Sequence, residues 1–212
     1  MFAKIKYYFE QSWVLMMAAL VFGALLAITE AAWRPRIEQN TINQFNRLAG
    51  LLLPEAVQFE SAAAEPVWIE IDGKTVPVDV KRGLDASGRT VGWAFVCEGS
   101  GFADKIQLVV ATDAAFETIA GFRVLSSNET PGFGDKINIP PDQGGFFQPQ
   151  FIGAPVGTLT LVKSGDPAEI NDQIVAISGA TVSSQAVVDI FNSYLVPIKQ
   201  KLIAEGLLKT SP

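Results

Sequence analysis

An uncharged run between Trp13 and Thr29 limits most strongly what this chain can fold into. A helix from Trp13 to Trp33 rises about 30 Å at ~1.5 Å per residue, which matches the hydrocarbon thickness of a bilayer. Tryptophan is enriched at the two membrane interfaces, where these end residues would lie. We therefore expect one transmembrane helix over residues 13–33, preceded by a short cytoplasmic terminus of residues 1–12.

Basic residues flank this run on both sides. Lys4 and Lys6 favour a cytoplasmic N-terminus, although Arg34 and Arg36 weaken the bias. The expected topology is a single pass, with the main domain outside the cytoplasm. A cleaved signal peptide is the alternative. A retained anchor is expected instead, because the run is longer than a signal peptide needs and Glu30 interrupts its small-residue cleavage sites.

The composition excludes several kinds of chemistry. The chain has no histidine, which removes imidazole acid–base catalysis and histidine-ligated metals. Its lone cysteine, Cys97, excludes an intramolecular disulfide and cannot supply the ligands of an iron–sulfur cluster. The net charge of −6 argues against a nucleic-acid partner. Any redox chemistry must therefore come from an organic cofactor.

Residues 34–66 predict a stalk helix followed by a linker. Apolar side chains between Ile37 and Leu52 recur on roughly one face of a helix that would continue from the membrane span and stop at Pro54. Ser61–Pro66 has the composition of an exposed loop.

The remaining residues, 67–212, predict one α+β domain. Val67–Ile71 and Lys74–Val80 flank Asp72-Gly73, which is the strongest hairpin signal in the chain. Closely spaced strands with hairpin-length connections favour a mainly antiparallel sheet. Further strands are expected at Thr90–Val96, Lys105–Ala111, Ile119–Leu125 and Val156–Val162.

Small residues mark a junction between a strand and the last helix. The apolar run Ile174–Ile177 precedes Ser178-Gly179-Ala180-Thr181, and a helix is expected from Ser183 to about Leu208, kinked or divided by Pro197. Such a junction aims unpaired N–H groups and the positive end of the helix dipole at one point, where a phosphate binds readily. On these residues alone a second interpretation stays open, in which Ser183 or Ser184 simply caps the helix.

A second motif, Glu129-Thr130-Pro131-Gly132-Phe133-Gly134-Asp135-Lys136-Ile137, lies upstream of this junction. Pro131 disfavours a helix before it and Gly132 permits positive φ, so the motif predicts a turn, which alone would be a surface turn with Phe133 exposed. In this order the two motifs resemble those of the FMN-binding domain family, in particular the G subunit of the Rnf electron-transport complex. The C subunit of the sodium-pumping NADH:quinone oxidoreductase shares both motifs. The resemblance covers about Arg82 to Tyr194.

The resemblance implies a flavin site. In that family the threonine of the Ser-Gly-Ala-Thr motif carries FMN through a phosphoester bond, which implies covalent FMN on Thr181. It also implies that Glu129 and Thr130 offer polar contacts to the flavin and that Phe133 offers an apolar one. Lys163 would place a positive charge near the flavin or its phosphate, and a solvated strand-end lysine is the alternative. The cofactor-binding residues expected are Thr181, Ser178, Gly179, Ala180, Ser183, Ser184, Glu129, Thr130, Gly132, Phe133, Gly134 and Lys163, with no catalytic residue and no metal ligand.

The sequence departs from the family pattern at Val175, where many relatives carry aspartate in the part of the motif that the modifying flavin transferase reads. Asp172, three residues earlier, is a possible substitute. Ser126-Ser127-Asn128 stand where family members often carry histidine, and Phe133 replaces the more usual leucine.

The expected function is that of an electron-transfer flavoprotein subunit in a membrane-bound, ion-translocating oxidoreductase of the Rnf type. Such a chain belongs to the translocase class and is not catalytic alone. Its expected partners are the membrane, other membrane subunits and a flavin transferase, with the main domain on the periplasmic side of a bacterial inner membrane. Two alternatives stay open. One is an anchored scaffold of the same fold without flavin, which Val175 favours, and the other is a protein nearer to the C subunit of the sodium pump.

Overall fold

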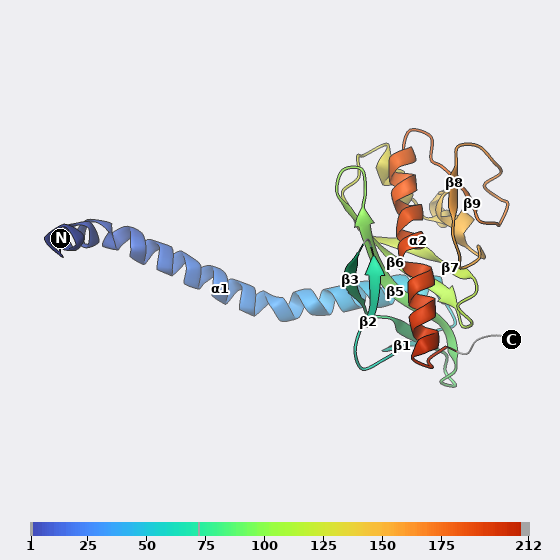
Figure 1. The fold of residues 1–212 in the computed structure, drawn as a ribbon, viewed down its shortest axis with the longest axis horizontal. Helices are drawn as coiled ribbons and strands as arrows, with labels where there is room; N and C mark the ends of the chain where they lie inside the picture. The colour runs from blue at the N-terminus through green and yellow to red at the C-terminus, as the bar shows by residue number, and fades with distance from the viewer. Residues whose placement is uncertain (1, 72, 209–212) are drawn as a thin grey trace. The chain divides into compact units, whose positions relative to one another are not determined.

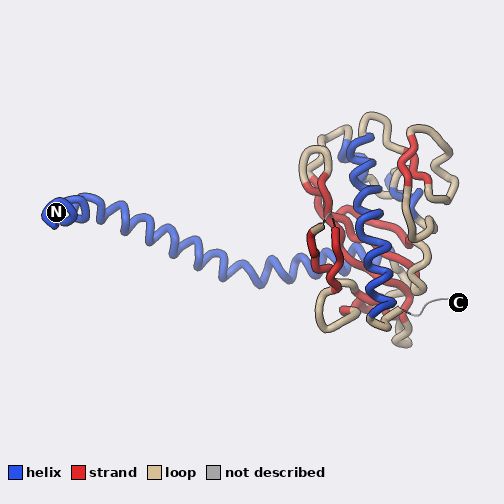
Figure 2. Tube along the Cα trace, viewed as in Figure 1, coloured by secondary structure: helices blue, strands red, loops and turns tan. Residues whose placement is uncertain are grey.

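The computed structural model describes residues 2–71 and 73–208 (Figure 1), and it describes side chains from Ser12 onward. The chain divides into two compact units, Met1–Gln44 and Phe45–Pro212. In its described residues the first unit is helical, whereas the second combines helices and strands (Figure 2).

Helix α1 (Phe2–Leu52) includes, within Ser12–Leu52, a segment long and apolar enough to cross a membrane. Charged groups gather after the apolar run. Arg34 Nη2 donates to Glu30 Oε1 at 2.6 Å, and the Arg36 guanidinium carbon lies 5.7 Å from the ring centre of Trp33. An ion pair and a cation–π contact beside a tryptophan are typical of the interfacial end of a membrane span.

The end of α1 belongs to the second unit. The helix stops at Leu52, shortly before Pro54, as the sequence predicts, because a proline disfavours helical geometry in the residue that precedes it. Phe45, Leu48, Ala49 and Leu52 are all buried. The predicted stalk therefore ends as a packed element of the domain.

The main sheet has five strands in the order β1-β4-β5-β6-β7, and every neighbouring pair is antiparallel. The predicted hairpin forms a separate two-stranded sheet, and a third sheet of two short strands is parallel. The strands are β1 (Gln58–Ser61), β2 (Val67–Ile71), β3 (Lys74–Val78), β4 (Lys81–Leu84), β5 (Thr90–Ser100), β6 (Lys105–Asp113), β7 (Ile119–Ser127), β8 (Thr160–Val162) and β9 (Gln173–Val175). Three short 3₁₀ helices, η1 (Gly134–Asn138), η2 (Pro141–Gln143) and η3 (Gln148–Phe151), precede β8, and α2 (Thr181–Ala204) follows β9.

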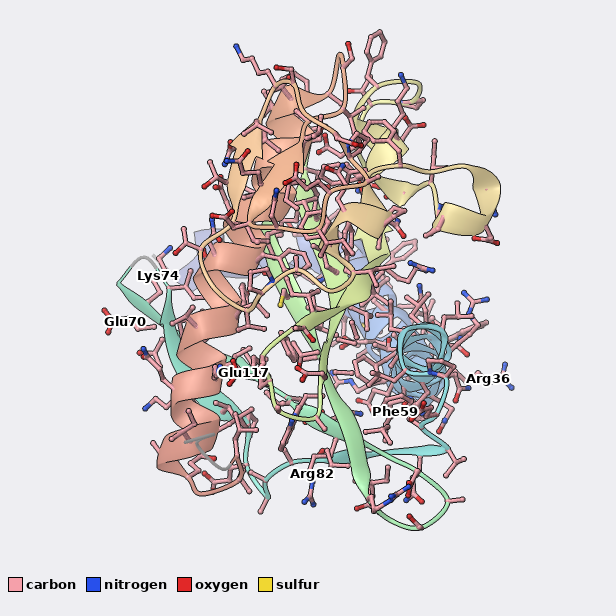
Figure 3. The ribbon with its side chains drawn as sticks, turned by 90° about the vertical axis from the view of Figure 1, so that its right-hand side faces the viewer. Arg36, Phe59, Glu70, Lys74, Arg82 and Glu117 are labelled. Carbon is pink, nitrogen blue, oxygen red and sulfur yellow. The ribbon has the colours of Figure 1, made fainter. Side chains whose placement is uncertain are left out.

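The main sheet is covered on both faces, with α2 on one side and the last turns of α1 on the other (Figure 3). Strand alternation explains how one strand serves two cores. In β5, Phe95 and Cys97 belong to the core under α2, while Ala94 belongs to the core under α1. In β6, Leu108 belongs to the core under α2 and Val109 to the core under α1.

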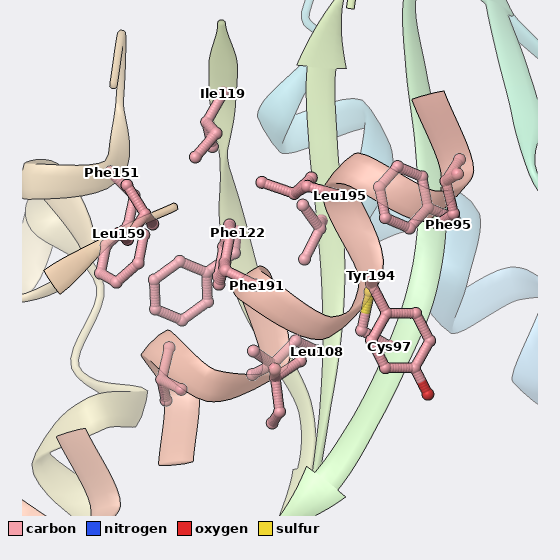
Figure 4. Packing of buried hydrophobic residues seen from close by; sticks show 14 of the residues in the cluster. Phe95, Cys97, Leu108, Ile119, Phe122, Phe151, Leu159, Phe191, Tyr194 and Leu195 are labelled. Carbon is pink, nitrogen blue, oxygen red and sulfur yellow. The ribbon is translucent and has the colours of Figure 1, made fainter. Parts of the chain in front are cut away.

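Phenylalanines dominate the core between α2, β7 and η3 (Figure 4). The ring centres of Phe122 and Phe151 lie 4.9 Å apart, and those of Phe151 and Phe191 lie 4.7 Å apart. Asn192 fixes the loop beside this core, because its side chain accepts from the Leu159 N–H and donates to the Leu159 carbonyl. Helix α2 is thus held by both apolar packing and polar contacts.

The α+β class, the antiparallel sheet and the C-terminal helix are as the sequence predicts, but strands β1 and β4 are not expected from it, and several other details differ. The strand expected over Val156–Val162 shrinks to β8 and pairs with β9 in parallel. The last helix begins at Thr181 rather than Ser183 and passes through Pro197 without ending. The segment predicted as the linker Ser61–Pro66 begins at the last residue of an edge strand.

Candidate functional site

The Glu129–Ile137 motif folds as a tight turn that leads into η1. The Phe133 N–H donates to the Thr130 carbonyl at 3.1 Å, and Gly132 between them has φ of 78°. Proline followed by glycine at positive φ is the sequence of a type II turn. The turn leaves the Phe133 side chain 56% exposed.

The Ser178–Thr181 junction leads into the start of helix α2, whose N-cap residue is Ala180. No side chain caps this end of the helix. Gly179 has φ of 81°, and the Ala180 N–H donates back to the Ile177 carbonyl at 2.9 Å. Thr181 is the first helical residue, and its side chain is exposed. An uncapped helix N-terminus presents N–H donors and a positive dipole end, which together suit a phosphate.

The turn and the junction face each other across a pocket of about 450 Å³. Two exposed aromatic side chains, Phe102 and Phe133, form part of its lining, and its described lining includes no basic side chain. The lining residues are Phe102, Thr130, Phe133, Gly134, Gly179, Ala180, Thr181, Val182 and Ser183. Its volume and apolar character are in the range of small-molecule sites.

A buried carboxylate lies behind this pocket. Glu129 is only 5% exposed, and both of its oxygens are engaged by the protein. Oε1 accepts from the N–H groups of Phe102 and Ala103 at 2.9 and 3.1 Å, and Oε2 accepts from Ser183 Oγ at 2.5 Å. Glu129 is therefore not among the residues that line the pocket, although the sequence suggests it as a direct flavin contact.

The hypothesis that Ser183 or Ser184 caps the helix is wrong. Ser183 donates to Glu129 instead. Ser184 Oγ donates to the Ala180 carbonyl at 2.9 Å and accepts from the Ile177 N–H at 3.1 Å. Ser183 and Ser184 are the third and fourth residues of α2, because the helix begins at Thr181. A capping residue would have to precede the first helical residue. The first-turn N–H groups are left without a side-chain cap.

The twelve site residues expected from the sequence divide into two groups. Those that line the pocket are Thr130, Phe133, Gly134, Gly179, Ala180, Thr181 and Ser183. Those that do not are Glu129, Gly132, Ser178, Ser184 and Lys163. Lys163 is exposed just beyond β8. Whether any of these residues binds a flavin stays a prediction.

Two lining residues, Phe102 and Val182, are absent from the binding residues that the sequence predicts. Phe102 lies at the tip of the β5–β6 hairpin and is 66% exposed. An aromatic residue beside glycine in a polar turn is the signal that could have found it.

Polar contacts hold the hairpin that carries Phe102. Asn128 Nδ2 donates to Asp104 Oδ2 at 2.9 Å, and this hydrogen bond lowers the pKa of Asp104. Lys105 Nζ donates to Glu98 Oε1 at 2.8 Å, which lowers the pKa of Glu98 and raises that of Lys105. These exposed contacts add little stability.

The chain carries the sequence pattern of the FMN-binding domain over residues 101–196. It is 36% identical to the G subunit of the ion-translocating oxidoreductase complex of Methanosarcina acetivorans, in an alignment that covers 84% of this chain and 88% of that protein. It is 29% identical to the G subunit of the Na⁺-translocating ferredoxin:NAD⁺ oxidoreductase complex of Acetobacterium woodii, over 86% of this chain and 87% of that one. The crystal structure of NqrC from Shewanella oneidensis has the same fold, with a TM-score of 0.54 at 23% identity over 71% of this chain and 73% of that one.

The residues of the pocket fit a flavin mononucleotide. Such a ligand needs an apolar slot for its ring and donors for its phosphate. The slot is lined by Phe102 and Phe133, and the donors are the first-turn N–H groups of α2 beside the exposed hydroxyl of Thr181. In the described residues no group of three or more cysteine, aspartate or glutamate side chains is arranged to hold a metal ion.

Proposed function

This chain belongs to the family of G subunits of ion-translocating oxidoreductase complexes, and on that premise we propose that it is the electron-carrying flavoprotein of such a membrane complex. One observation carries the proposal: an exposed threonine stands at an uncapped helix N-terminus and faces a turn with an exposed aromatic side chain across a pocket of suitable size. No general acid or base is required of the protein, because electron transfer depends on holding and tuning the cofactor.

The proposed cofactor is FMN, joined by a phosphoester to Thr181. The helix N-terminus of α2 would hold the phosphate, and Phe102 and Phe133 would offer apolar contacts to the ring. When bound, FMN supplies the electron-carrying chemistry, and the chain supplies position and environment. A covalent tether suits a relay, because the carrier is never released between electron transfers.

Attachment is a phosphoryl transfer that needs a partner enzyme. A bond forms between the Thr181 hydroxyl oxygen and the flavin phosphorus as the bond from that phosphorus to its leaving group breaks. The hydroxyl proton passes to a base of the transferase, and the leaving group departs with the bonding electrons. The donor is therefore an activated flavin nucleotide, and the partner is a flavin transferase. A threonine hydroxyl is a weak nucleophile, so the reaction depends on how the transferase positions it.

The proposed setting is a bacterial inner membrane, with α1 as a single-pass anchor and the second unit on the periplasmic side. The apolar segment of α1 and the ion-translocating complexes named among the relatives support the anchor. The lysines before that segment support the orientation. Other subunits of the complex would then supply and accept the electrons. This chain would belong to a translocase without being catalytic alone.

A second candidate is an anchored scaffold of the same fold that carries no flavin. Val175 is the observation that favours it, because the residue occupies a position where the family motif often has an acidic side chain. In that case the pocket would remain a structural cleft, and the chain would act only by binding its partner subunits.

Substitution of the acceptor tests the proposal. The Thr181→Ala variant should lose all flavin fluorescence that survives denaturing gel electrophoresis after co-expression with a flavin transferase. The Thr181→Ser variant should keep part of it, because the hydroxyl remains, and Thr160→Ala should keep it in full, because Thr160 is an exposed threonine outside the pocket and outside both motifs. Undiminished fluorescence from Thr181→Ala would refute the attachment site. Absence of flavin from the wild-type chain in its native host would favour the scaffold.

A further inference from the structure

The buried carboxylate of Glu129 joins three segments that line the pocket. Glu129 itself begins the turn that carries Phe133. Its Oε1 binds the N–H groups of Phe102 and Ala103, at the tip of the β5–β6 hairpin. Its Oε2 binds the hydroxyl of Ser183, in the first turn of α2. These segments are far apart in sequence, so this side chain is a direct link between them.

Two glycines make room for this carboxylate. A Cβ placed on Gly101 would collide with Glu129 Oε1, and one placed on Gly134 would collide with Glu129 Oε2 and Ser183 Oγ. Neither glycine has the positive φ that would itself demand glycine. The close approach of the carboxylate is therefore one reason that both positions exclude a side chain; at Gly101 the Asp104 carbonyl and the Ile106 side chain also leave no room.

We infer that Glu129 is a positioning residue for the proposed flavin site, which fixes the gap between Phe102, Phe133 and Thr181 and places a negative charge behind the pocket wall. The inference rests on the proposed function, which supplies the identity of the ligand in the pocket. Three donors converge on a side chain that makes no direct contact with the pocket space. A fixed negative charge near a redox group disfavours its reduction, because reduction adds negative charge. Glu129 therefore holds the potential of a bound flavin lower than a neutral side chain would.

Two substitutions separate the geometric role from the charge. Glutamine at position 129 keeps an oxygen for the N–H groups of Phe102 and Ala103, and its amide group donates to Ser183, so the link persists without the charge. Alanine removes the link altogether. The matched control is Glu98→Gln, which removes one negative charge from the hairpin whose tip Glu129 binds, at an exposed residue outside the pocket.

The first measurement is hydrogen exchange in the flavin-free, full-length protein in detergent. Glu129→Ala should raise the exchange rates of the Phe102 and Ala103 amides by about tenfold or more, since each loses its acceptor. Glu129→Gln and Glu98→Gln should leave these rates within about twofold of wild type. If Glu129→Ala fails to fold, Ser183→Ala replaces it and should raise the exchange rates of the Phe102 and Ala103 amides to a smaller extent, because the Glu129 carboxylate then loses the contact that holds its Oε2. Unchanged exchange of the Phe102 and Ala103 amides in Glu129→Ala would overturn the inference.

The second measurement is the midpoint potential of the flavin-loaded protein, which a merely structural role would not move. Glu129→Gln should retain bound flavin and shift its potential to a less negative value, while Glu98→Gln should shift it much less. Equal potentials for wild type and Glu129→Gln would refute the charge effect. A wild-type protein that carries no flavin would instead refute the proposed function, and the exchange measurement would still decide the geometric role.

Discussion

At the scale of single residues, burial decides which polar groups in this chain are structural and which are available. Glu129 and Ser183 are buried and satisfy each other, whereas Thr181 is exposed at the mouth of the pocket. Cys97 is the sole thiol and is buried beside Tyr194 in the core under α2 (Figure 4). Burial raises the pKa of this thiol well above its usual range.

We expect Cys97 to be inert in the folded protein. Thiol reagents attack the thiolate, and a raised pKa leaves less thiolate at any pH near 8 than in the unfolded chain. Alkylation by iodoacetamide at pH 8 should be at least about 100-fold slower in the native protein than in denaturant, because reaction also requires opening of the core. Mass spectrometry of timed samples measures the two rates. Rapid native alkylation would show that Cys97 is accessible and that the core is looser than its close packing implies.

The local sequence predicts the acceptor but not the support behind it. Thr181 and Gly179 stand in a local motif whose residue types suit a tight turn before a helix, so local pattern is sufficient there. The bond between Glu129 and Ser183 joins positions 54 apart in the chain, and no local pattern encodes such a contact. Phe102 escapes prediction for a related reason: the hairpin that carries it meets the pocket only through tertiary packing.

At the scale of elements, the short β8–β9 sheet positions the segment that leads to the acceptor. The side chain of Gln150, which is 2% exposed, holds β9 from η3: it accepts from the Val175 N–H at 2.7 Å and donates to the Val175 carbonyl at 3.1 Å. The backbone at Val175 is thus fixed by contacts that do not depend on its side chain. Long alternating strands are predictable from sequence, whereas three-residue strands fixed by a distant glutamine are not.

The transferase should therefore detect the side chain at 175 rather than a change in the fold. If it reads an acidic group there, Val175→Asp should raise the flavinylated fraction of this chain on co-expression, and Val175→Asn should not, although the two differ little in shape. If Asp172 already serves, Asp172→Asn should lower that fraction. Intact mass spectrometry measures the fraction in each variant. Complete and equal flavinylation of wild type, Val175→Asp and Asp172→Asn would show that no acidic residue here is read.

At the scale of the whole molecule, the sequence separates an apolar helix from a water-exposed domain, and the proposed topology follows from the charges around that helix. Lys4 and Lys6 precede it, whereas Arg34 is paired with Glu30 after it. Orientation follows the lysines and arginines beside a span, so the lysines favour an N-terminus inside and the arginines after the span weaken that preference.

A reporter enzyme that is active only outside the cytoplasm should be active when fused after Leu208. The physical reason is that a single span with its N-terminus inside leaves everything that follows it outside. The control fusion lacks residues 13–33 and should be inactive, because nothing then directs export. Activity confined to a cytoplasmic reporter at the same position would reverse the proposed orientation.

The final turns of α1 also set where this chain can be shortened. Phe45, Leu48 and Leu52 cover the back of β5 and β6, each contributing about 1.5–3 kcal/mol by burial. A protein cut at Val67, where the strand-rich sequence starts, would lose that cover and the edge strand β1 and would present a bare apolar sheet to water. A cut ahead of Phe45 removes only residues that lie outside the second unit. The limit of the second unit thus lies inside a helix, at a position that no change of composition marks.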